Sequence, residues 1–241
     1  MLETLVALLT AHVLADFLVQ TDAMVAAKDT PKGMAQHIAC VVILAGLAIG
    51  SLNPPVLGVI FITHLAMDLT KTHLMQKMAG WLSFTLDQVV HLAVIVALAV
   101  IWPDVARQGF WGQLPADLQS LYYSGLIIAA GLTVAVLVGG IVMDMMMRSI
   151  VTKIGETPKG IDGGGRLIGW LERALIFFFI VYGQPEGVGL LLGAKSILRF
   201  GDIQQAKEQA HTEYVIIGTM LSFGWALIVA VVSKAAVAHW R

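Results

Sequence analysis

The sequence predicts an all-α integral membrane protein, a polytopic bundle of about eight transmembrane helices in two four-helix groups. Of its 241 residues, 58% are hydrophobic and 13% are charged, whereas soluble domains are nearer 45–50% apolar and about 25% charged. The mean hydropathy of +0.82 agrees with this composition. Since each span needs roughly 20 apolar residues, eight spans use most of the chain and leave no room for a sizeable soluble domain.

Apolar runs separated by polar or proline-rich breaks define the expected helices. They cover residues 2–20, 35–52, 56–74, 82–102, 121–146, 166–182, 186–200 and 213–236. Asn53-Pro54-Pro55 predicts a tight turn between the second and third helices. Residues 186–200 are short for a span and rich in glycine, which is typical of a re-entrant or tilted element and equally of a plain short helix. The predicted regions are a membrane half at 1–102, a linker at 103–120 and a second membrane half at 121–241.

Basic residues indicate which side of the membrane each loop occupies. Ten of the 15 lysines and arginines fall in alternate loops, which share one side if the helix count is even. These ten are Lys28, Lys32, Lys71, Lys77, Arg148, Lys153, Lys159, Arg166, Arg199 and Lys207. The opposite side holds only Arg107, Lys234 and Arg241. Because lysine and arginine are enriched in cytoplasmic loops, we expect both termini to lie outside the cytoplasm.

Charge and cysteine content exclude several classes of protein. The net charge of −1 provides no basic excess for nucleic acid. Cys40 is the single cysteine, so neither an intrachain disulfide nor a cysteine-based metal site is possible.

Three histidine–aspartate pairs recur at the same spacing in the first half. Residues four apart share one face of a helix, so each pair presents an imidazole beside a carboxylate. The pairs are His12/Asp16, His64/Asp68 and Asp87/His91. In the predicted topology they lie in the cytoplasmic half of the membrane, where His37 opens another helix. Ionisable groups cost roughly 2.5–3.5 kcal/mol each within a span, so their common depth indicates shared partners.

Imidazole and carboxylate ligands together suit a divalent metal, with zinc expected first and manganese or iron as alternatives. The candidate ligands are His12, Asp16, His64, Asp68 and His91. His37 and Gln20 are candidates to orient those ligands, and Asp87 is the candidate general base. Two other interpretations remain open, namely hydrogen bonds within each helix and a proton relay.

The second half carries a different polar cluster. Gly163-Gly164-Gly165 precedes a helix and could present backbone N–H groups to an anion, although such a run is also typical of a flexible linker. The candidate substrate-binding residues are Lys71 from the first half and Arg166, Glu172, Arg173, Lys195 and Arg199. Ion pairs that only connect helices would explain Glu172, Arg173 and Lys195 equally well.

Four stretches together resemble one uncharacterised family. They are His12-x-x-x-Asp16-Phe17-x-x-Gln20, Gly169-x-Leu171-Glu172-Arg173, Ala194-Lys195-Ser196-x-x-Arg199-Phe200 and Glu213-Tyr214-x-x-Ile217-Gly218-Thr219. The chain thereby resembles domain-of-unknown-function family 3307 over nearly its whole length. The resemblance implies a multi-pass protein of the bacterial inner (cytoplasmic) membrane, and it supplies no activity. In that membrane, the bias of the basic residues predicts that both termini are periplasmic. A looser resemblance to membrane-bound metal-dependent hydrolases rests on the His/Asp spacing alone and assigns no residue role.

These observations lead to one functional hypothesis and two rivals. The hypothesis is a metal-dependent hydrolase or transferase that acts on a phosphorylated or lipid-linked substrate, with membrane lipid as its surroundings. The first rival is an ion-coupled secondary transporter or proton-relay protein, and the second is a non-enzymatic membrane scaffold. The sequence indicates neither the oligomeric state nor the substrate.

The predicted orientation can be tested by cysteine labelling in a variant that lacks Cys40. A cysteine at position 112 should react with a membrane-impermeant maleimide in intact cells, because that loop is expected in the periplasm. A cysteine at position 159 should react only after permeabilisation. The reverse pattern would show that the orientation is inverted.

Overall fold

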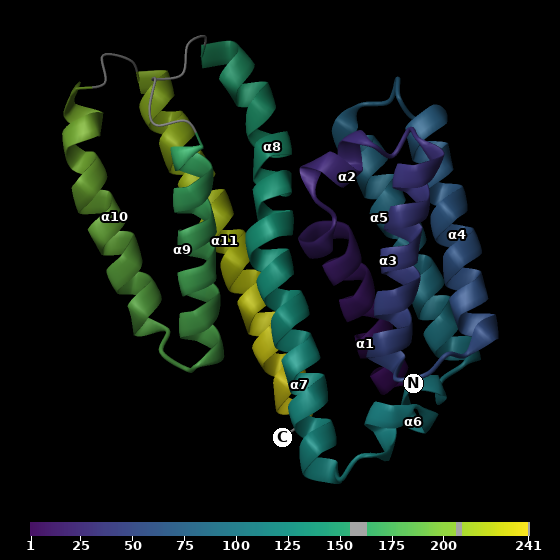
Figure 1. Cartoon of the computed structure of the whole chain (residues 1–241). Coiled ribbons are helices and arrows are strands. Elements are labelled where there is room, and N and C mark those ends of the chain that lie inside the picture. Colours follow the sequence, from purple (N-terminus) through teal and green to yellow (C-terminus); the bar gives the residue numbers. More distant parts are fainter. Residues whose placement is uncertain (155–162, 206–208, 241) are drawn as a thin grey trace. The chain divides into compact units, whose positions relative to one another are not determined.

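The computed structural model describes residues 1–154, 163–205 and 209–240, with side chains described for 1–148, 163–197 and 213–240. Every regular element in these ranges is helical (Figure 1). The chain divides into two compact units. The first comprises Met1–Ala130 together with Trp240, and the second comprises Gly131–His239.

The first unit is built from four long helices and the first part of a fifth. They are α1 (Leu2–Val13) with its π-helical continuation η1 (Leu14–Val19), α3 (Pro31–Ile49), α4 (Pro54–His73), α5 (Gly80–Ile101) and the start of α7 (Ala116–Thr133). The short elements α2 (Asp22–Ala26), α6 (Val105–Gln108) and η2 (Phe110–Gln113) connect them. Helix α1 packs against α3 and α5, and α4 packs against the same two helices.

Local sequence signals set the ends of α3 and α4. Thr30 accepts a hydrogen bond from the Gly33 N–H at the start of α3, and Asn53 accepts one from the Val56 N–H at the start of α4. A proline follows each capping residue, where its fixed φ suits the first helical turn and its missing N–H costs nothing. The predicted turn at Asn53 therefore lies between α3 and α4.

The last carbonyls of α3 are satisfied by residues far along the chain. Helix C-termini leave carbonyls without helical partners. Trp111 Nε1 donates to the Leu47 carbonyl at 2.6 Å, the Tyr122 hydroxyl to Ala48 at 2.8 Å, and the Phe110 N–H to Gly50 at 2.8 Å. The segment between α5 and α7 is thus fixed as a cap on α3, which explains why it is more ordered than a simple linker.

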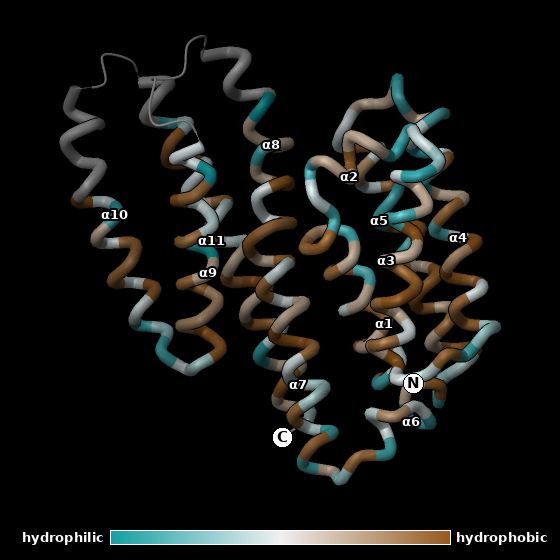
Figure 2. Tube along the Cα trace, in the orientation of Figure 1, coloured by the Kyte–Doolittle hydropathy of each residue, from teal (hydrophilic) through white to brown (hydrophobic). Residues whose placement is uncertain are grey.

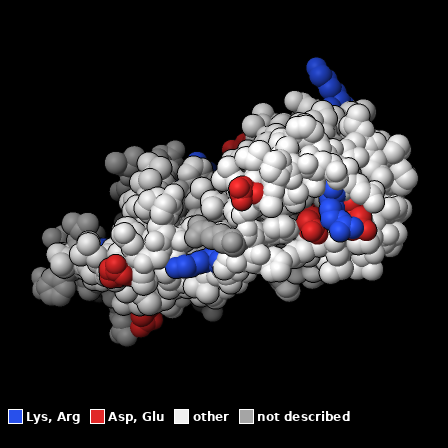
Figure 3. All heavy atoms as spheres, turned by 90° about the horizontal axis from the view of Figure 1, so that it is seen from below, with Lys and Arg blue, Asp and Glu red and all other residues white. Residues whose placement is uncertain are grey.

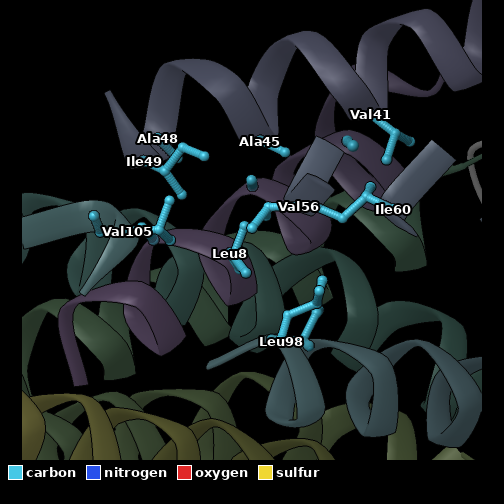
Figure 4. Close-up of a cluster of buried hydrophobic side chains, with 14 residues drawn as sticks. Leu8, Val41, Ala45, Ala48, Ile49, Val56, Ile60, Leu98 and Val105 are labelled. Carbon is cyan, nitrogen blue, oxygen red and sulfur yellow. The ribbon is translucent and has the colours of Figure 1, made fainter. Parts of the chain in front are cut away.

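An apolar core fills the first unit between its long helices. Leu8, Val41, Val56, Ile60 and Leu98 are all at most 8% exposed, and Figure 4 shows their side chains converging from α1, α3, α4 and α5. Apolar residues dominate the middle of these helices, whereas many hydrophilic residues gather at the end that holds α2 (Figure 2). The polar site described below lies at that end.

The second unit contains the remainder of α7, η3 (Val134–Val138), α8 (Gly139–Ile154), α9 (Gly164–Val181), α10 (Glu186–Gln205) and α11 (Gln209–Ala238). Helix α11 packs along α9 and against η3 and α8, and α10 packs against α9. Ile176, Phe223 and Ala226 form a small apolar core between α9 and α11.

The all-helical prediction is confirmed for the described ranges, and each of the expected helices overlaps an observed one. Five helical segments are long and apolar enough to cross a membrane: Leu2–Val19, Pro31–Ile49, Gly80–Ile101, Ala116–Arg148 and Glu213–Ala238. Eight spans in two groups of four therefore stay a prediction.

Three boundaries differ from the sequence prediction. The expected helix 121–146 is part of a continuous helical stretch, Ala116–Ile154, whose middle is π-helical. The expected short element 186–200 is wrong in length, because α10 continues for 20 residues through its glycines. The expected linker 103–120 contains α6, η2 and the first turn of α7.

Seen from below, most of the visible surface is uncharged, with acidic and basic side chains among the uncharged ones (Figure 3). The orientation in the membrane stays a prediction. A Cβ at Gly112 would lie 2.3 Å from the Arg107 carbonyl oxygen. Exposed Ala116 is therefore a better position than residue 112 for the outer labelling site.

Gly109 provides a test of how α3 is capped. A Cβ there would lie 2.0 Å from the Ile49 carbonyl oxygen, whereas a Cβ at Gly58, within α4, would meet nothing within 4 Å. We expect Gly109→Ala to lower the free energy of unfolding in detergent by about 1–3 kcal/mol through overpacking. Gly58→Ala should leave it unchanged or raise it slightly. Equal thermal shifts in the two variants would contradict this account of the cap.

Candidate functional site

Four helices bring the histidine–aspartate residues to one place, at the end of the first unit that holds α2. Asp16 lies in η1, just after the α-helical part of the first helix, and His37 lies in the second turn of α3. Asp68 is near the end of α4, and Asp87 is near the start of α5. The group is nearly inaccessible to solvent, since the exposed fractions are His12 6%, His37 0%, His64 4%, Asp68 2%, Asp87 3% and His91 4%.

Each predicted pair has its imidazole beside its carboxylate. His12 Nδ1 lies 3.6 Å from Asp16 Oδ2, His64 Nε2 lies 3.8 Å from Asp68 Oδ2, and His91 Nε2 lies 3.3 Å from Asp87 Oδ1. The pairs also meet one another. The rings of His64 and His91 stack with their centroids 4.1 Å apart. The ring centroid of His12 lies 5.1 Å from that of His91, and the ring centroid of His37 lies 5.2 Å from that of His64.

Four potential ligand atoms within this cluster lie close together. They are His37 Nε2, His64 Nε2, Asp16 Oδ1 and Asp68 Oδ2. The two nitrogens are 3.1 Å apart. His37 Nε2 lies 3.3 Å from Asp68 Oδ2 and 3.6 Å from Asp16 Oδ1, and His64 Nε2 lies 3.8 Å and 3.5 Å from the same two oxygens. Ligands at zinc-like bond lengths of about 2.0–2.2 Å in a tetrahedron are separated by roughly 3.3–3.5 Å.

Gln20 contacts Nδ1 of His37, and the other ring nitrogen, Nε2, belongs to this group of four atoms. With its amide oxygen turned inward, Gln20 accepts hydrogen bonds from His37 Nδ1 at 3.0 Å and from Lys28 Nζ at 2.9 Å, and its nitrogen donates to the Asp16 carbonyl at 3.3 Å. A proton on Nδ1 leaves the Nε2 lone pair of a neutral imidazole free. A metal-binding histidine is commonly held in this way by a partner on its other nitrogen.

A second group of potential ligands adjoins the first. One oxygen each from Asp68 and Asp87 and a nitrogen of His91 lie within 4.8 Å of one another. Asp68 belongs to both groups. A carboxylate shared in this way is suited to bridging two cations, which lie about 3.5–4 Å apart in two-metal sites.

Two lysines neutralise part of the buried negative charge. Lys28 Nζ lies 3.0 Å from each oxygen of Asp68, and Lys71 Nζ lies 2.7 Å from Asp87 Oδ2. Asp16 is the third carboxylate, and its Oδ1 has no hydrogen-bond partner among the residues that the structure describes. With all three carboxylates ionised and the imidazoles neutral, two ammonium groups leave one negative charge to be balanced inside the cluster.

The apolar core closes the cluster on the side away from α2. A cavity of about 30 Å³ lies between them, lined by apolar residues together with His12, Thr63, His64 and His91. A water molecule needs about 10–15 Å³ and polar partners, so the cavity has room for one.

The structure brings together all the first-half residues that the sequence singled out. Lys28 and Gln88 also belong to the cluster and were not predicted. Gln88 bridges His12 Nε2 at 3.2 Å and Asp87 Oδ2 at 3.0 Å. Its position beside Asp87 in the sequence was the available signal. The sequence analysis counts Lys28 only as a basic loop residue, because nothing in the sequence indicates that the α2 segment folds back to Asp68.

Three of the second-half candidates are held by polar contacts within the second unit. Lys195 Nζ bonds Glu172 at 2.6 Å. Arg173 is 4% exposed and donates to the Val136 carbonyl at 3.3 and 3.1 Å and to Ser222 at 3.0 Å. Arg166 is exposed and lies over the Trp170 ring. The side chain of Arg199 lies outside the described residues. A single cavity shared by the two halves stays a prediction.

Comparison with known proteins identifies a family and no activity. Residues 4–111 match the model of the family described as "Protein of unknown function (DUF3307)", which confirms the predicted resemblance over that part of the chain. The matched region contains every residue of the histidine–aspartate cluster, whereas the motifs noted at 169–219 lie beyond it. No curated protein and no solved structure matches the chain.

The ion pair between Lys28 and Asp68 should contribute strongly to stability. Removing one partner of a buried pair strands the other charge, so Lys28→Ala should lower the free energy of unfolding by about 3 kcal/mol. The double variant Lys28→Ala/Asp68→Asn should recover much of that loss. As a control, Arg107→Ala breaks an exposed pair with Asp104 and should cost below about 1 kcal/mol. Chemical unfolding in detergent would measure all three variants, and no recovery in the double variant would contradict the pairing.

Proposed function

We propose that this protein is a metal-dependent membrane hydrolase or transferase, with a divalent cation held by the histidine–aspartate cluster. The substrate would be phosphorylated or lipid-linked. In the predicted topology the site faces the cytoplasm. Zinc is the first candidate for the cation, with manganese and iron as alternatives, because all three accept mixed imidazole and carboxylate ligands.

The observation that carries the proposal is the set of four donor atoms from His37, His64, Asp16 and Asp68. Five of their six separations lie between 3.1 and 3.8 Å, close to the edges of a tetrahedron around zinc. This geometry moves His37 from an orienting role into the ligand set. His12 forms a further possible group with Asp16 and His64, and its other ring nitrogen contacts Gln88, while His91 and Asp87 belong to the adjoining group.

Charge supports the same proposal. Asp16 is the carboxylate without a lysine, and its unsatisfied oxygen is one of the four donors. A divalent cation would neutralise it where a neutral ligand would not. When bound, such an ion lowers the pKa of a water ligand or polarises a phosphoryl oxygen. Asp87 would then serve as general base, and Lys71, which is 36% exposed, lies beside it to attract an anionic group.

A proton relay is the rival with a specific observation in its favour. The 3.1 Å separation of His37 Nε2 and His64 Nε2 is also that of a hydrogen bond between imidazoles, and His12 and His91 extend the series. Transport along such a series would need a continuation to the opposite side. The close-packed core of Leu8, Val41, Ile60 and Leu98 occupies that direction, which favours an enzyme open on one side over a carrier.

Elemental analysis of full-length protein purified in detergent without chelators tests the proposal. We expect about one or two divalent ions per chain. His37→Ala, His64→Ala and Asp16→Asn should each lower zinc affinity by at least about tenfold, since each removes one of the four ligands. His73→Ala is the matched control, because His73 is an exposed residue of the same α4 helix and should leave the metal content unchanged.

The result that would overturn the proposal is a clean absence of metal after incubation with zinc and with manganese. Turnover of a simple phosphoester by the metal-loaded protein, lost in His64→Ala, would support the enzyme. Ion uptake into proteoliposomes by metal-free protein would favour the carrier instead. A protein with neither property would be a scaffold whose polar residues specify helix packing.

A further inference from the structure

A long apolar groove runs along the outer side of α3 and α4 in the first unit. Its main part has a volume of about 680 Å³, with walls that include Ile38, Ala39, Phe61 and Leu65. A second hollow of about 490 Å³ continues it, since both parts share Val42 and Ile43 as lining residues. Phe110 and Trp111 line the second hollow near the end of α3.

The dimensions of the main part fit one lipid chain. From Pro31 to Ile43 a helix rises by about 20 Å, slightly more than the roughly 15 Å of hydrocarbon in one leaflet. Several lining residues remain open to the surroundings, with Phe61 46% and Ile43 60% exposed. Because α3 qualifies as a membrane span, the surroundings of this groove are the acyl chains of lipids.

One end of the groove is polar and suited to an anion. Lys28, Asp29, Thr30 and His73 line it, and it lies at the N-terminus of α3, where the helix dipole favours negative charge. Asp29 opposes an anion there, so the positive charge at this end comes from Lys28 and from the N-terminus of α3. The groove thus has an apolar body and a polar end where an anionic head group can meet a lysine.

Lys28 connects this groove to the proposed metal centre. Its ammonium group contacts both oxygens of Asp68, and its side chain also lines the polar end of the groove. A cation bound to Asp68 would compete with Lys28 for that carboxylate. Lys28 would then be released to an anionic partner in the groove, next to the cluster.

We propose that the α3/α4 groove binds an anionic phospholipid, with one acyl chain between the two helices and the head-group phosphate at Lys28. This inference rests on the proposed function in one respect only, that metal at Asp68 strengthens lipid binding by releasing Lys28. It places a lipid phosphate beside the metal cluster and so assigns the substrate to the lipid-phosphate class.

Native mass spectrometry of the full-length chain in detergent can count bound lipid and bound zinc together. The probes are phosphatidylglycerol and phosphatidylcholine with identical acyl chains. We expect phosphatidylglycerol to bind about fivefold more tightly, the effect of one lysine near an anionic lipid. Lys28→Gln should abolish this preference, Lys28→Arg should keep it, and Lys77→Gln is the control at an exposed lysine that does not line the groove.

The chain-binding part of the groove is tested separately. Ala39→Phe fills the groove and should reduce binding of both lipids at least tenfold without changing the zinc content. Ala93→Phe is the matched control, because Ala93 is equally exposed on α5 and does not line the groove. Binding that is insensitive to Ala39→Phe, or equal for the two lipids in the wild-type protein, would overturn the lipid site.

Failure of the metal proposal gives a different pattern. A protein without zinc that still prefers phosphatidylglycerol through Lys28 and the groove would retain the lipid site and lose the metal centre. If zinc binds, it should strengthen phosphatidylglycerol binding in the wild-type protein and not in Lys28→Gln. An equal effect of zinc on both would contradict the release of Lys28. Dimerisation that responds to Ala39→Phe, with no lipid bound, would assign the groove to a second copy of the chain.

Discussion

The first unit depends on how it neutralises three carboxylates within an apolar helix bundle. Removing a carboxylate from water costs several kcal/mol even after the protein relaxes. Asp68 and Asp87 are neutralised by lysines, and this requirement explains why the segment after α1 folds back far enough for Lys28 to reach Asp68. Asp16 is left with imidazoles alone. The ordering of α2, the end of α4 and the start of α5 thus follows from one charge requirement, and the same requirement leaves the cluster attractive to a cation.

The sequence predicted the parts of this arrangement that depend on a single helix. The i,i+4 spacing placed His12 beside Asp16, His64 beside Asp68 and Asp87 beside His91, and the common depth predicted that these pairs would meet. Contacts between different helices could not be predicted in this way. His37 has no acidic residue four positions away, so its central place depends on the packing of α3 against α1 and α4, which no local pattern encodes. Lys28 resembled any other loop lysine for the same reason.

The ends of the elements show the same division between local and tertiary causes. Thr30, Asn53 and the prolines that follow them are local signals, and they set the starts of α3 and α4. The ordered segment between α5 and α7 instead owes its structure to the carbonyls of Leu47, Ala48 and Gly50, which only the folded unit presents. Hydropathy predicts where an apolar helix runs, but it does not show which distant donor satisfies the end of that helix.

The two π-helical segments differ in how their carbonyls are satisfied among the described residues. A π-turn breaks the regular hydrogen-bond pattern and often occurs at functional sites, and in an apolar setting its carbonyls need other donors. In the second unit, Arg173 donates to the η3 carbonyl of Val136, and Trp225 donates to that of Val134. The buried Arg173 guanidinium thus satisfies a backbone carbonyl. In η1 the Asp16 carbonyl is satisfied by the neutral amide of Gln20. The Asp16 carboxylate therefore stays beside the imidazoles of His12, His37 and His64.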